Sequence, residues 1–226
     1  MHTRQLAVQS VRFVLAQTRR FLKERPDGID VTSKTSYDLP ADLPVPVDDG
    51  GCKGLRGRRI PSVPLVSTSE RRVDLSSLSG TVVVFCYPHT GRPNMPNPKE
   101  WDDIPGARGC TPQACSFRDH FSRLRDLDAT VYGLSADSTE WQQEAVQRLQ
   151  LPFELLSDSA LEFTGSIGLP TFQSDGRVFI KRVSLIIDQG RIEKVFYPIF
   201  PPDRNASDII AFLQSPAKSS IQSSEG

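Results

Sequence analysis

The amino-acid sequence predicts a mixed α/β fold in which parallel strands are completed by an antiparallel hairpin. Residues 81–87 (TVVVFCY) form an apolar, β-branched run bounded by Gly80 and Pro88, which is typical of a buried strand. Helical and strand patterns then alternate, and two strand patterns near the end of the chain flank a turn at 188–190. This order of elements is that of a layered α/β protein.

The elements after the first strand can be assigned one by one. Thr111 suits a helix N-cap and Pro112 the first helical position, and apolar residues at helical spacing continue this helix to Asp128. The expected elements that follow are a strand at 130–136, a helix at 138–149 capped by Ser138, a strand at 153–156, a helix at 159–167 ending at Gly168, hairpin strands at 183–187 and 192–197 joined through Asp188-Gln189-Gly190, and a helix at 206–213. Parallel strands linked by helices and finished by a hairpin fit a thioredoxin-like sheet.

Three regions are predicted along the chain. Residues 1–36 form a basic, helical N-terminal extension, residues 37–215 the thioredoxin-like domain, and residues 216–226 a disordered, Ser-rich tail. The first 25 residues carry six basic side chains and a single acid, so this segment is either a surface helix appended to the domain or a mitochondrial transit peptide. Five prolines in residues 36–64 predict extended chain that wraps the domain.

The composition excludes several functional classes. The 226 residues include 27 basic and 27 acidic side chains, a balance that gives no electrostatic argument for nucleic acid as a partner. No run approaches 18 apolar residues, so no membrane span is expected. Four cysteines are too few for a disulfide-stapled secreted scaffold, and the start of the chain lacks a secretory signal. We therefore expect a reducing, cytoplasmic compartment, with a mitochondrial one as the alternative.

Two of the cysteines, Cys110 and Cys115, lie in the segment GCTPQACSFRD at 109–119. A structural zinc site needs about four ligands, usually in close pairs, and Cys-x4-Cys with His89 and His120 elsewhere matches it poorly. A static disulfide is also disfavoured on a regular helix, where residues five apart differ by about 7.5 Å in rise and about 140° around the axis. A disulfide requires Cα atoms within about 7 Å and converging side chains.

The third interpretation of this pair is a working redox couple. Cys110 lies at a helix start, where unpaired N–H groups and the helix dipole stabilise a thiolate, and Arg108 precedes it. Cys115 is held away until the first turn unwinds, after which it could attack an oxidised Cys110. Without further evidence, Arg108 is better explained as a solvated loop charge, and Cys115 is as well explained as a small buried core residue.

The same segment resembles the active-site segment of the peroxiredoxins, in particular the atypical two-cysteine Q or bacterioferritin-comigratory type, which reads close to G-C-T-x-x-A-C-S-F-R-D. Three further segments match in order: VVVFCYP at 82–88, LLSD at 155–158 and RVSLIID at 182–188. Together they span about residues 60–215. The resemblance therefore implies a thioredoxin-like peroxiredoxin domain.

By this resemblance, Cys110 is the peroxidatic cysteine, which becomes a sulfenic acid, and Cys115 is the resolving cysteine. Arg182 matches the arginine that lies over the active site and stabilises the thiolate and the departing oxygen. The implied activity is reduction of hydrogen peroxide or organic hydroperoxides, with recycling by a thioredoxin- or glutaredoxin-type dithiol. No metal or organic cofactor is implied, and the chain is expected to be a monomer or weak homodimer. The alternatives are a thiol–disulfide oxidoreductase and a non-catalytic redox sensor.

The chain departs from the family motif P-x-x-x-T-x-x-C. Position 107, where the motif has Thr, is Ala. The motif Pro is either Pro88, with an insertion of about fifteen residues after it, or Pro105, with the segment shortened by two, and the hydroxyl comes from Thr90 or Thr111. We expect Trp101 to anchor this loop by packing. We also expect Cys86 to be an inert core thiol, Cys52 an unpaired surface thiol and His89 a structural residue.

Overall fold

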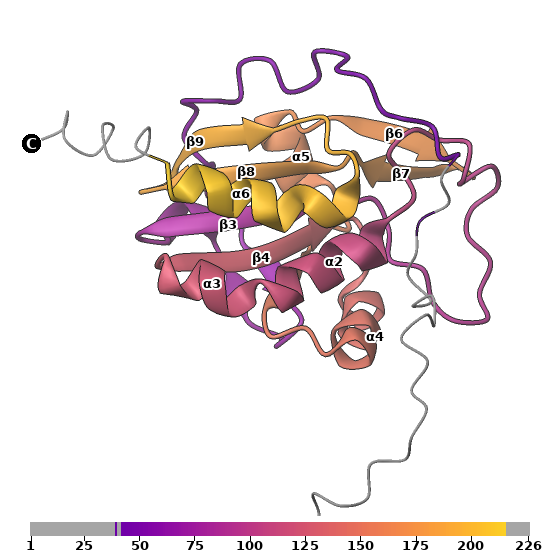
Figure 1. The fold of residues 1–226 in the computed structure, drawn as a ribbon, viewed down its shortest axis with the longest axis horizontal. Coiled ribbons are helices and arrows are strands. Elements are labelled where there is room, and N and C mark those ends of the chain that lie inside the picture. Colours follow the sequence, from indigo (N-terminus) through magenta and orange to yellow (C-terminus); the bar gives the residue numbers. More distant parts are fainter. Residues whose placement is uncertain (1–38, 40–41, 216–226) are drawn as a thin grey trace, which may run out of the picture. The chain divides into compact units, whose positions relative to one another are not determined.

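The computed structural model describes residue 39 and residues 42–215 (Figure 1). The predicted N-terminal extension and C-terminal tail lie outside the described residues, and the predicted domain boundaries stay a prediction. A seven-stranded sheet has the order β2-β1-β5-β4-β3-β8-β9. Its strands are β1 (Leu65–Ser67), β2 (Arg72–Val73), β3 (Thr81–Cys86), β4 (Ala129–Ser135), β5 (Glu154–Ser157), β8 (Val183–Asp188) and β9 (Arg191–Phe196). The predicted mixed α/β, thioredoxin-like layout is therefore confirmed.

The first predicted strand, β3, lies at the centre of this sheet. It pairs in parallel with β4 and antiparallel with β8, and all six of its residues are buried. A central strand covered on both faces reads as a continuous apolar run, which explains the pattern TVVVFC. The strands β8 and β9 form the predicted hairpin, whose turn residues Gln189 and Gly190 both have positive φ.

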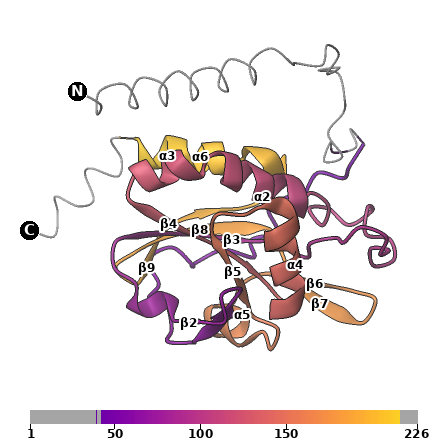
Figure 2. The ribbon, with the colours of Figure 1, turned by 90° about the horizontal axis from the view of Figure 1, so that it is seen from below.

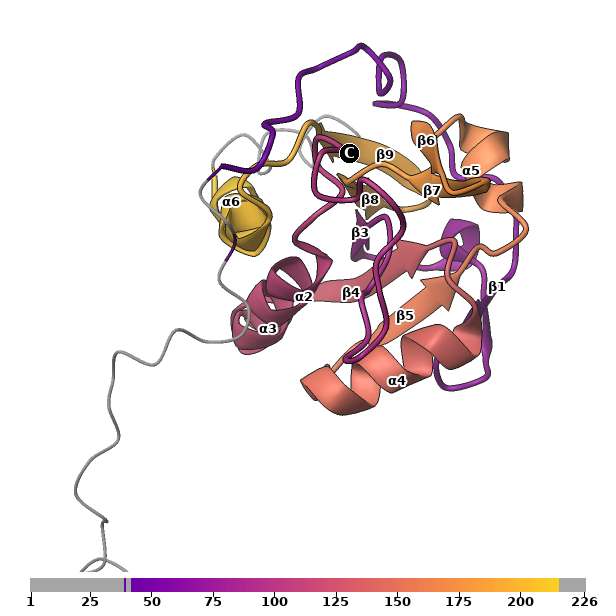
Figure 3. The same ribbon diagram turned by 90° about the vertical axis from the view of Figure 1, so that its right-hand side faces the viewer.

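The helices lie on both faces of the sheet. One face carries α2 (Cys110–Asp119), α3 (Phe121–Asp126) and α6 (Asn205–Leu213), which share an apolar cluster with α4 (Thr139–Leu149) (Figures 2 and 3). The other face is covered by α5 (Glu162–Ile167) and by apolar side chains of the extended segment before β1, including Leu55 and Ile60. Two short 3-10 helices, η1 (Leu75–Ser77) and η2 (Pro202–Arg204), complete the fold.

The start of α2 differs from the prediction in a way that matters for the site. The helix begins at Cys110 with Gly109 as its N-cap, and no side chain caps it. The predicted N-cap role of Thr111 is therefore wrong. The predicted single helix to Asp128 is also two helices, because the chain breaks at His120. This shift places Cys110 itself at the first helical position.

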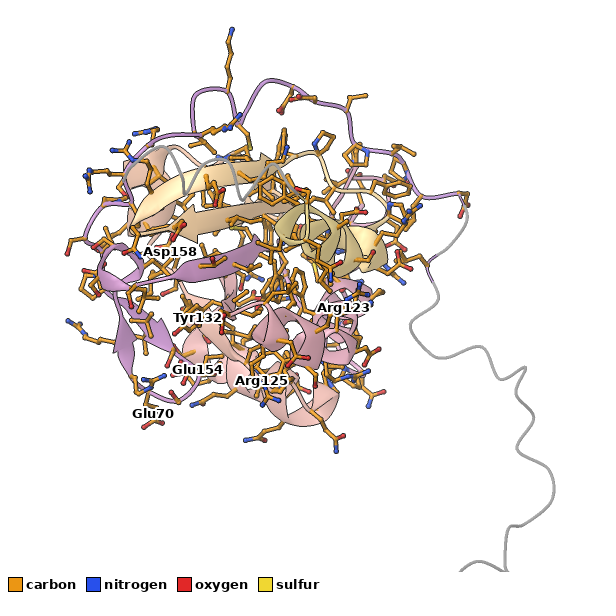
Figure 4. All side chains as sticks on the ribbon, turned by 60° about the vertical axis from the view of Figure 1, so that its left-hand side comes forward. Glu70, Arg123, Arg125, Tyr132, Glu154 and Asp158 are labelled. Atoms are coloured by element: carbon orange, nitrogen blue, oxygen red, sulfur yellow. The ribbon has the colours of Figure 1, made fainter. Side chains whose placement is uncertain are left out.

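The observed ends of α4 and α5 agree better with the predicted ones. Ser138 caps α4 as predicted, and its hydroxyl accepts from the amide of Trp141 at 3.3 Å. The helix α5 starts three residues later than predicted, because the buried carboxylate of Asp158, labelled in Figure 4, accepts from the amides of Phe163 and Thr164. Gly168 ends α5 in the left-handed conformation, as expected.

A second, smaller sheet was not predicted. The hairpin of β6 (Thr171–Ser174) and β7 (Arg177–Ile180) turns through Asp175-Gly176, a dipeptide that favours such turns (Figure 1). The loop between β3 and α2 packs on this hairpin. Its Trp101 is buried, with ring centroids 5.0 Å from Phe179 and 5.8 Å from Phe172. The predicted role of Trp101 as a packing anchor is confirmed.

Candidate active site

The candidate site is built around the thiol of Cys110. Gly109 has φ 103°, and a Cβ at this position would clash with the side chain of Pro202, so only glycine fits before the cysteine. The first turn of α2 leaves unpaired amides near the thiol, which favour negative charge there. The Cys110 thiol is buried at 5% exposure and donates to the carbonyl of Ala107 at 3.6 Å.

Arg182 lies directly beside this thiol. One of its terminal nitrogens, Nη2, is 3.3 Å from Cys110 Sγ and also donates to the carbonyls of residues 106, 107 and 108 at 3.0–3.2 Å. Arg182 directly precedes β8 and is only 3% exposed, so its charge is buried beside the thiol. The structure brings together two of the three predicted site residues, Cys110 and Arg182. A guanidinium at this distance stabilises the Cys110 thiolate and the negative charge that develops on an oxygen departing from the sulfur's substrate.

A third side chain at this point, Gln113, was missed by the sequence analysis. Gln113 is fully buried on the first turn of α2, and its carbonyl oxygen accepts from Nη1 of Arg182. Glutamine carries no charge, so no spacing rule marks it. A polar residue on the buried face of a helix that starts at a reactive cysteine is the signal that could have identified it.

Cys115 lies on the same helix. Like Cys110, it belongs to the apolar cluster beneath α2; it is 8% exposed, and burial raises the pKa of its thiol. The Arg118 charge offsets part of this effect. Cys110 and Cys115 are free thiols joined by regular helix. A bond between them therefore requires α2 to unwind at its start.

The loop before α2 supplies backbone where the family motif has a side chain. Ala107 takes the place of the motif Thr. Its carbonyl accepts hydrogen bonds from the Cys110 thiol and from the Arg182 guanidinium. Arg108 forms an ion pair with Asp102 of the same loop at 2.7 Å, so its charge is paired within the loop. Thr90 is buried, its amide donating to Asp137 and its carbonyl accepting from Trp141. Thr111 is half-buried on α2.

The remaining predicted residues have structural surroundings. His89 is buried and its Nδ1 pairs with Asp137, with the Trp141 ring 4.9 Å away, which agrees with the structural role expected for it. Cys86 is fully buried and burial raises its pKa, as expected of an inert core thiol. Cys52 is unpaired, as predicted, but it is partly buried against the apolar cluster on the α5 face of the sheet and does not lie on the surface, and burial raises its pKa to about 12.

Two negative findings concern the described residues only. Within residues 42–215, no group of three or more His, Cys, Asp or Glu side chains is arranged to hold a metal ion. No helix in this same range has both the length and the apolar composition that a membrane crossing requires.

The fold and this arrangement define a class, namely a thioredoxin-like protein with a thiol at a helix start beside a buried arginine. The chain belongs to the Redoxin family, whose model matches residues 55–211. Peroxiredoxin Q, chloroplastic, from Sedum lineare is 28% identical over 189 residues, which cover 83% of this chain and 92% of the relative. Putative peroxiredoxin bcp from Coxiella burnetii is 28% identical over 161 residues, covering 70% of this chain and 97% of the relative.

Solved structures agree with this family. Peroxidoxin BcpB from Mycobacterium tuberculosis superposes with a TM-score of 0.58 at 24% identity, covering 70% of this chain and 96% of that one. PrxQ from Xylella fastidiosa gives a TM-score of 0.59 at 19% identity, covering 72% and 96%. At these identities the likeness shows the fold. The family model and the curated relatives confirm the predicted peroxiredoxin of the Q type, an oxidoreductase with thiol peroxidase activity.

Proposed function

We propose that Cys110 is the peroxidatic cysteine and that Cys115 resolves it, with Arg182 as the charge-stabilising group. The observation that carries this proposal is the 3.3 Å contact between Arg182 Nη2 and Cys110 Sγ at the start of α2. The thiolate of Cys110 attacks the terminal oxygen of the peroxide, and the O–O bond breaks. The departing alkoxide or hydroxide takes up a proton and leaves as alcohol or water, while Cys110 becomes a sulfenic acid.

The second half of the cycle removes that oxygen. The thiol of Cys115 attacks the sulfur of the Cys110 sulfenic acid, water leaves, and a disulfide forms. A dithiol reductant of the thioredoxin type then reduces this disulfide and is itself oxidised. The overall reaction converts one peroxide and one dithiol into an alcohol or water, a second water and one disulfide. Consumption of NADPH in a thioredoxin-coupled assay with several peroxides tests this function.

Oxidation is expected to unwind the start of α2, because its two cysteines cannot bond on a regular helix. In the disulfide form, amides of residues 110–116 should exchange faster with solvent than in the dithiol form, while amides near Leu124 on α3 stay protected. Hydrogen-exchange mass spectrometry on the two redox states measures this difference. Equal protection of residues 108–118 in both states would rule out the unwinding step.

An apolar cavity beside Arg182 bears on the choice of peroxide. It has a volume of about 220 Å³, and Arg182 forms part of its wall together with Val47, Ile104, Phe172 and Ile199. The arginine that contacts the thiol therefore also faces an apolar space. Burial of one methylene contributes about 0.8 kcal/mol, so an alkyl or aryl group in this cavity favours an organic hydroperoxide over hydrogen peroxide.

This preference predicts the effect of a charge in the cavity wall. Replacing Val47, which is 80% exposed and tolerates a larger side chain, by Glu should lower kcat/KM for cumene hydroperoxide by about tenfold. The value for hydrogen peroxide should change by less than about twofold, because it has no apolar group to bury. Val45→Glu, in the same extended segment but outside the cavity wall, is the matched control. Equal losses for both peroxides would mean that the cavity does not select between them.

The reductant follows from the proposed chemistry, and the compartment is proposed from the sequence. We infer a thioredoxin- or glutaredoxin-type dithiol as reductant and a monomer or weak homodimer, which reduction assays with each dithiol and sedimentation would test. The relative from Sedum lineare is named chloroplastic, which is a statement about that protein. For this chain the cytoplasm stays the proposal, with the mitochondrion as the alternative, and cell fractionation decides between them.

A further inference from the structure

A line of buried polar side chains leads away from Arg182 to the last helix. Nε2 of Gln113 donates to Oδ1 of Asn205 at 2.9 Å, and the hydroxyl of Ser184 donates to the same Oδ1 at 2.7 Å. Gln113, Ser184 and Asn205 are each at most 1% exposed. They come from α2, β8 and the first residue of α6, which are neighbours in the fold (Figures 1 and 3).

The order of donors and acceptors in this line decides which atom faces the arginine. A glutamine amide has one oxygen that accepts and one nitrogen that donates, so its orientation depends on both neighbours. Arg182 only donates, and it requires the oxygen of Gln113. Gln113 can offer that oxygen only while its nitrogen has an acceptor, which is Oδ1 of Asn205. The Ser184 hydroxyl donates to the same oxygen and so adds a second hydrogen bond that holds Asn205 in place.

We propose that Asn205, held by Ser184, is a positioning residue that fixes the Gln113 amide and thereby holds Arg182 against the Cys110 thiol. This inference rests on the proposed function for its effect on turnover, but the contact between arginine and thiol exists without any peroxide. The simpler interpretation is that these polar groups merely satisfy one another in the core. However, this chain of hydrogen bonds continues beyond Gln113 to the Arg182 guanidinium, which contacts the reactive sulfur.

The two interpretations differ in what a substitution of Asn205 should do. Asn205→Leu keeps the size of the side chain but removes the acceptor, so Gln113 is free to turn its NH2 group toward Arg182 and displace it. Asn205→Asp keeps an oxygen that accepts from both Gln113 and Ser184. A positioning role therefore predicts loss in the leucine variant and recovery in the aspartate variant. Asp208→Leu, at an exposed position in the first turn of α6, is the matched control for helix stability.

The first readout needs no peroxide. Alkylation of Cys110 by iodoacetamide, followed by mass spectrometry of its peptide as a function of pH, reports how well the thiolate is stabilised. Asn205→Leu should move this profile to higher pH by about one unit, and Asn205→Asp and Asp208→Leu by much less. The rate of peroxide reduction should fall by about tenfold in Asn205→Leu and by much less in Asn205→Asp and Asp208→Leu. Ser184→Ala should shift both quantities in the same direction by a smaller factor.

The outcomes separate the inference from the proposed function. If the wild type does not reduce peroxides but the alkylation profile shifts as described, the function fails and the positioning role stands. A profile that stays unchanged in Asn205→Leu overturns the positioning role, whatever the rate does. A loss that Asp208→Leu reproduces is a stability effect and also overturns it. If the leucine variant does not fold by circular dichroism, Ser184→Ala decides, and its unchanged profile would overturn the proposal.

Discussion

Replacing Cys110 by Ser should abolish peroxide reduction, whereas replacing Cys115 by Ser should leave a single turnover that stops at a sulfenic acid. Serine keeps the size of the side chain but is not ionised near neutral pH, so no nucleophile remains beside Arg182. The loss should reach the background of the assay. In Cys115→Ser the first step is intact, since Cys110 and its contacts are unchanged, but no second thiol on α2 can release the oxygen. Stopped-flow measurement of one peroxide equivalent and mass spectrometry of Cys110 check both results.

Cys52→Ser is the matched control for loss of a thiol. Cys52 lies in the extended segment before β1, and burial raises its pKa to about 12, so it contributes little thiolate. Turnover of this variant should equal that of the wild type. Full turnover by Cys110→Ser together with inactivity of Cys115→Ser would reverse the two assigned roles. Peroxide consumption that stops at one equivalent in the wild type, with reductant present, would instead favour a redox sensor.

The central strands and the hairpin of the fold could be predicted from the sequence because their signals are local. The run TVVVFC is apolar throughout since β3 is covered on both faces, and Asp188-Gln189-Gly190 marks the β8–β9 turn. The hairpin β6–β7 carries the same kind of local signal in Asp175-Gly176, but its strands are short and half exposed. The break at His120 is not local, because the helical spacing of apolar residues continues across it.

The cysteines of the site could be predicted, but the contacts around them could not. Cys110 and Arg182 are separated by 72 positions in the chain, and only the motif match joined them. Thr111 suits an N-cap by type, yet the helix starts earlier because Gly109 adopts a left-handed conformation against Pro202. Gln113 and Asn205 escaped notice since neutral amides carry chemistry only through the partners that the fold gives them. Sequence spacing cannot supply those partners.

Arg182→Met is expected to slow the reaction of Cys110 with peroxide by roughly 100-fold or more, the scale for loss of one well-placed charge-stabilising donor. Methionine fills similar space but donates no hydrogen bond, so the thiolate and the departing oxygen both lose the guanidinium. The buried position of Arg182, at 3% exposure, makes this contact stronger than it would be in water. Stopped-flow kinetics of the first oxidation step measure the effect without interference from resolution.

Two further variants separate the contact from charge and from stability. Arg182→Lys keeps the charge but not the planar fork that bonds Gln113, three loop carbonyls and the thiol, so it should recover only part of the rate. Arg125→Met removes one positive charge from the exposed surface of α3, where Figure 4 labels it, and should leave the rate unchanged. A wild-type rate in Arg182→Met would mean that the guanidinium only ties the loop to β8. If Arg182→Met and Arg125→Met instead slowed the reaction to the same extent, the effect of Arg182 would come from overall charge and not from its direct contact with the thiol.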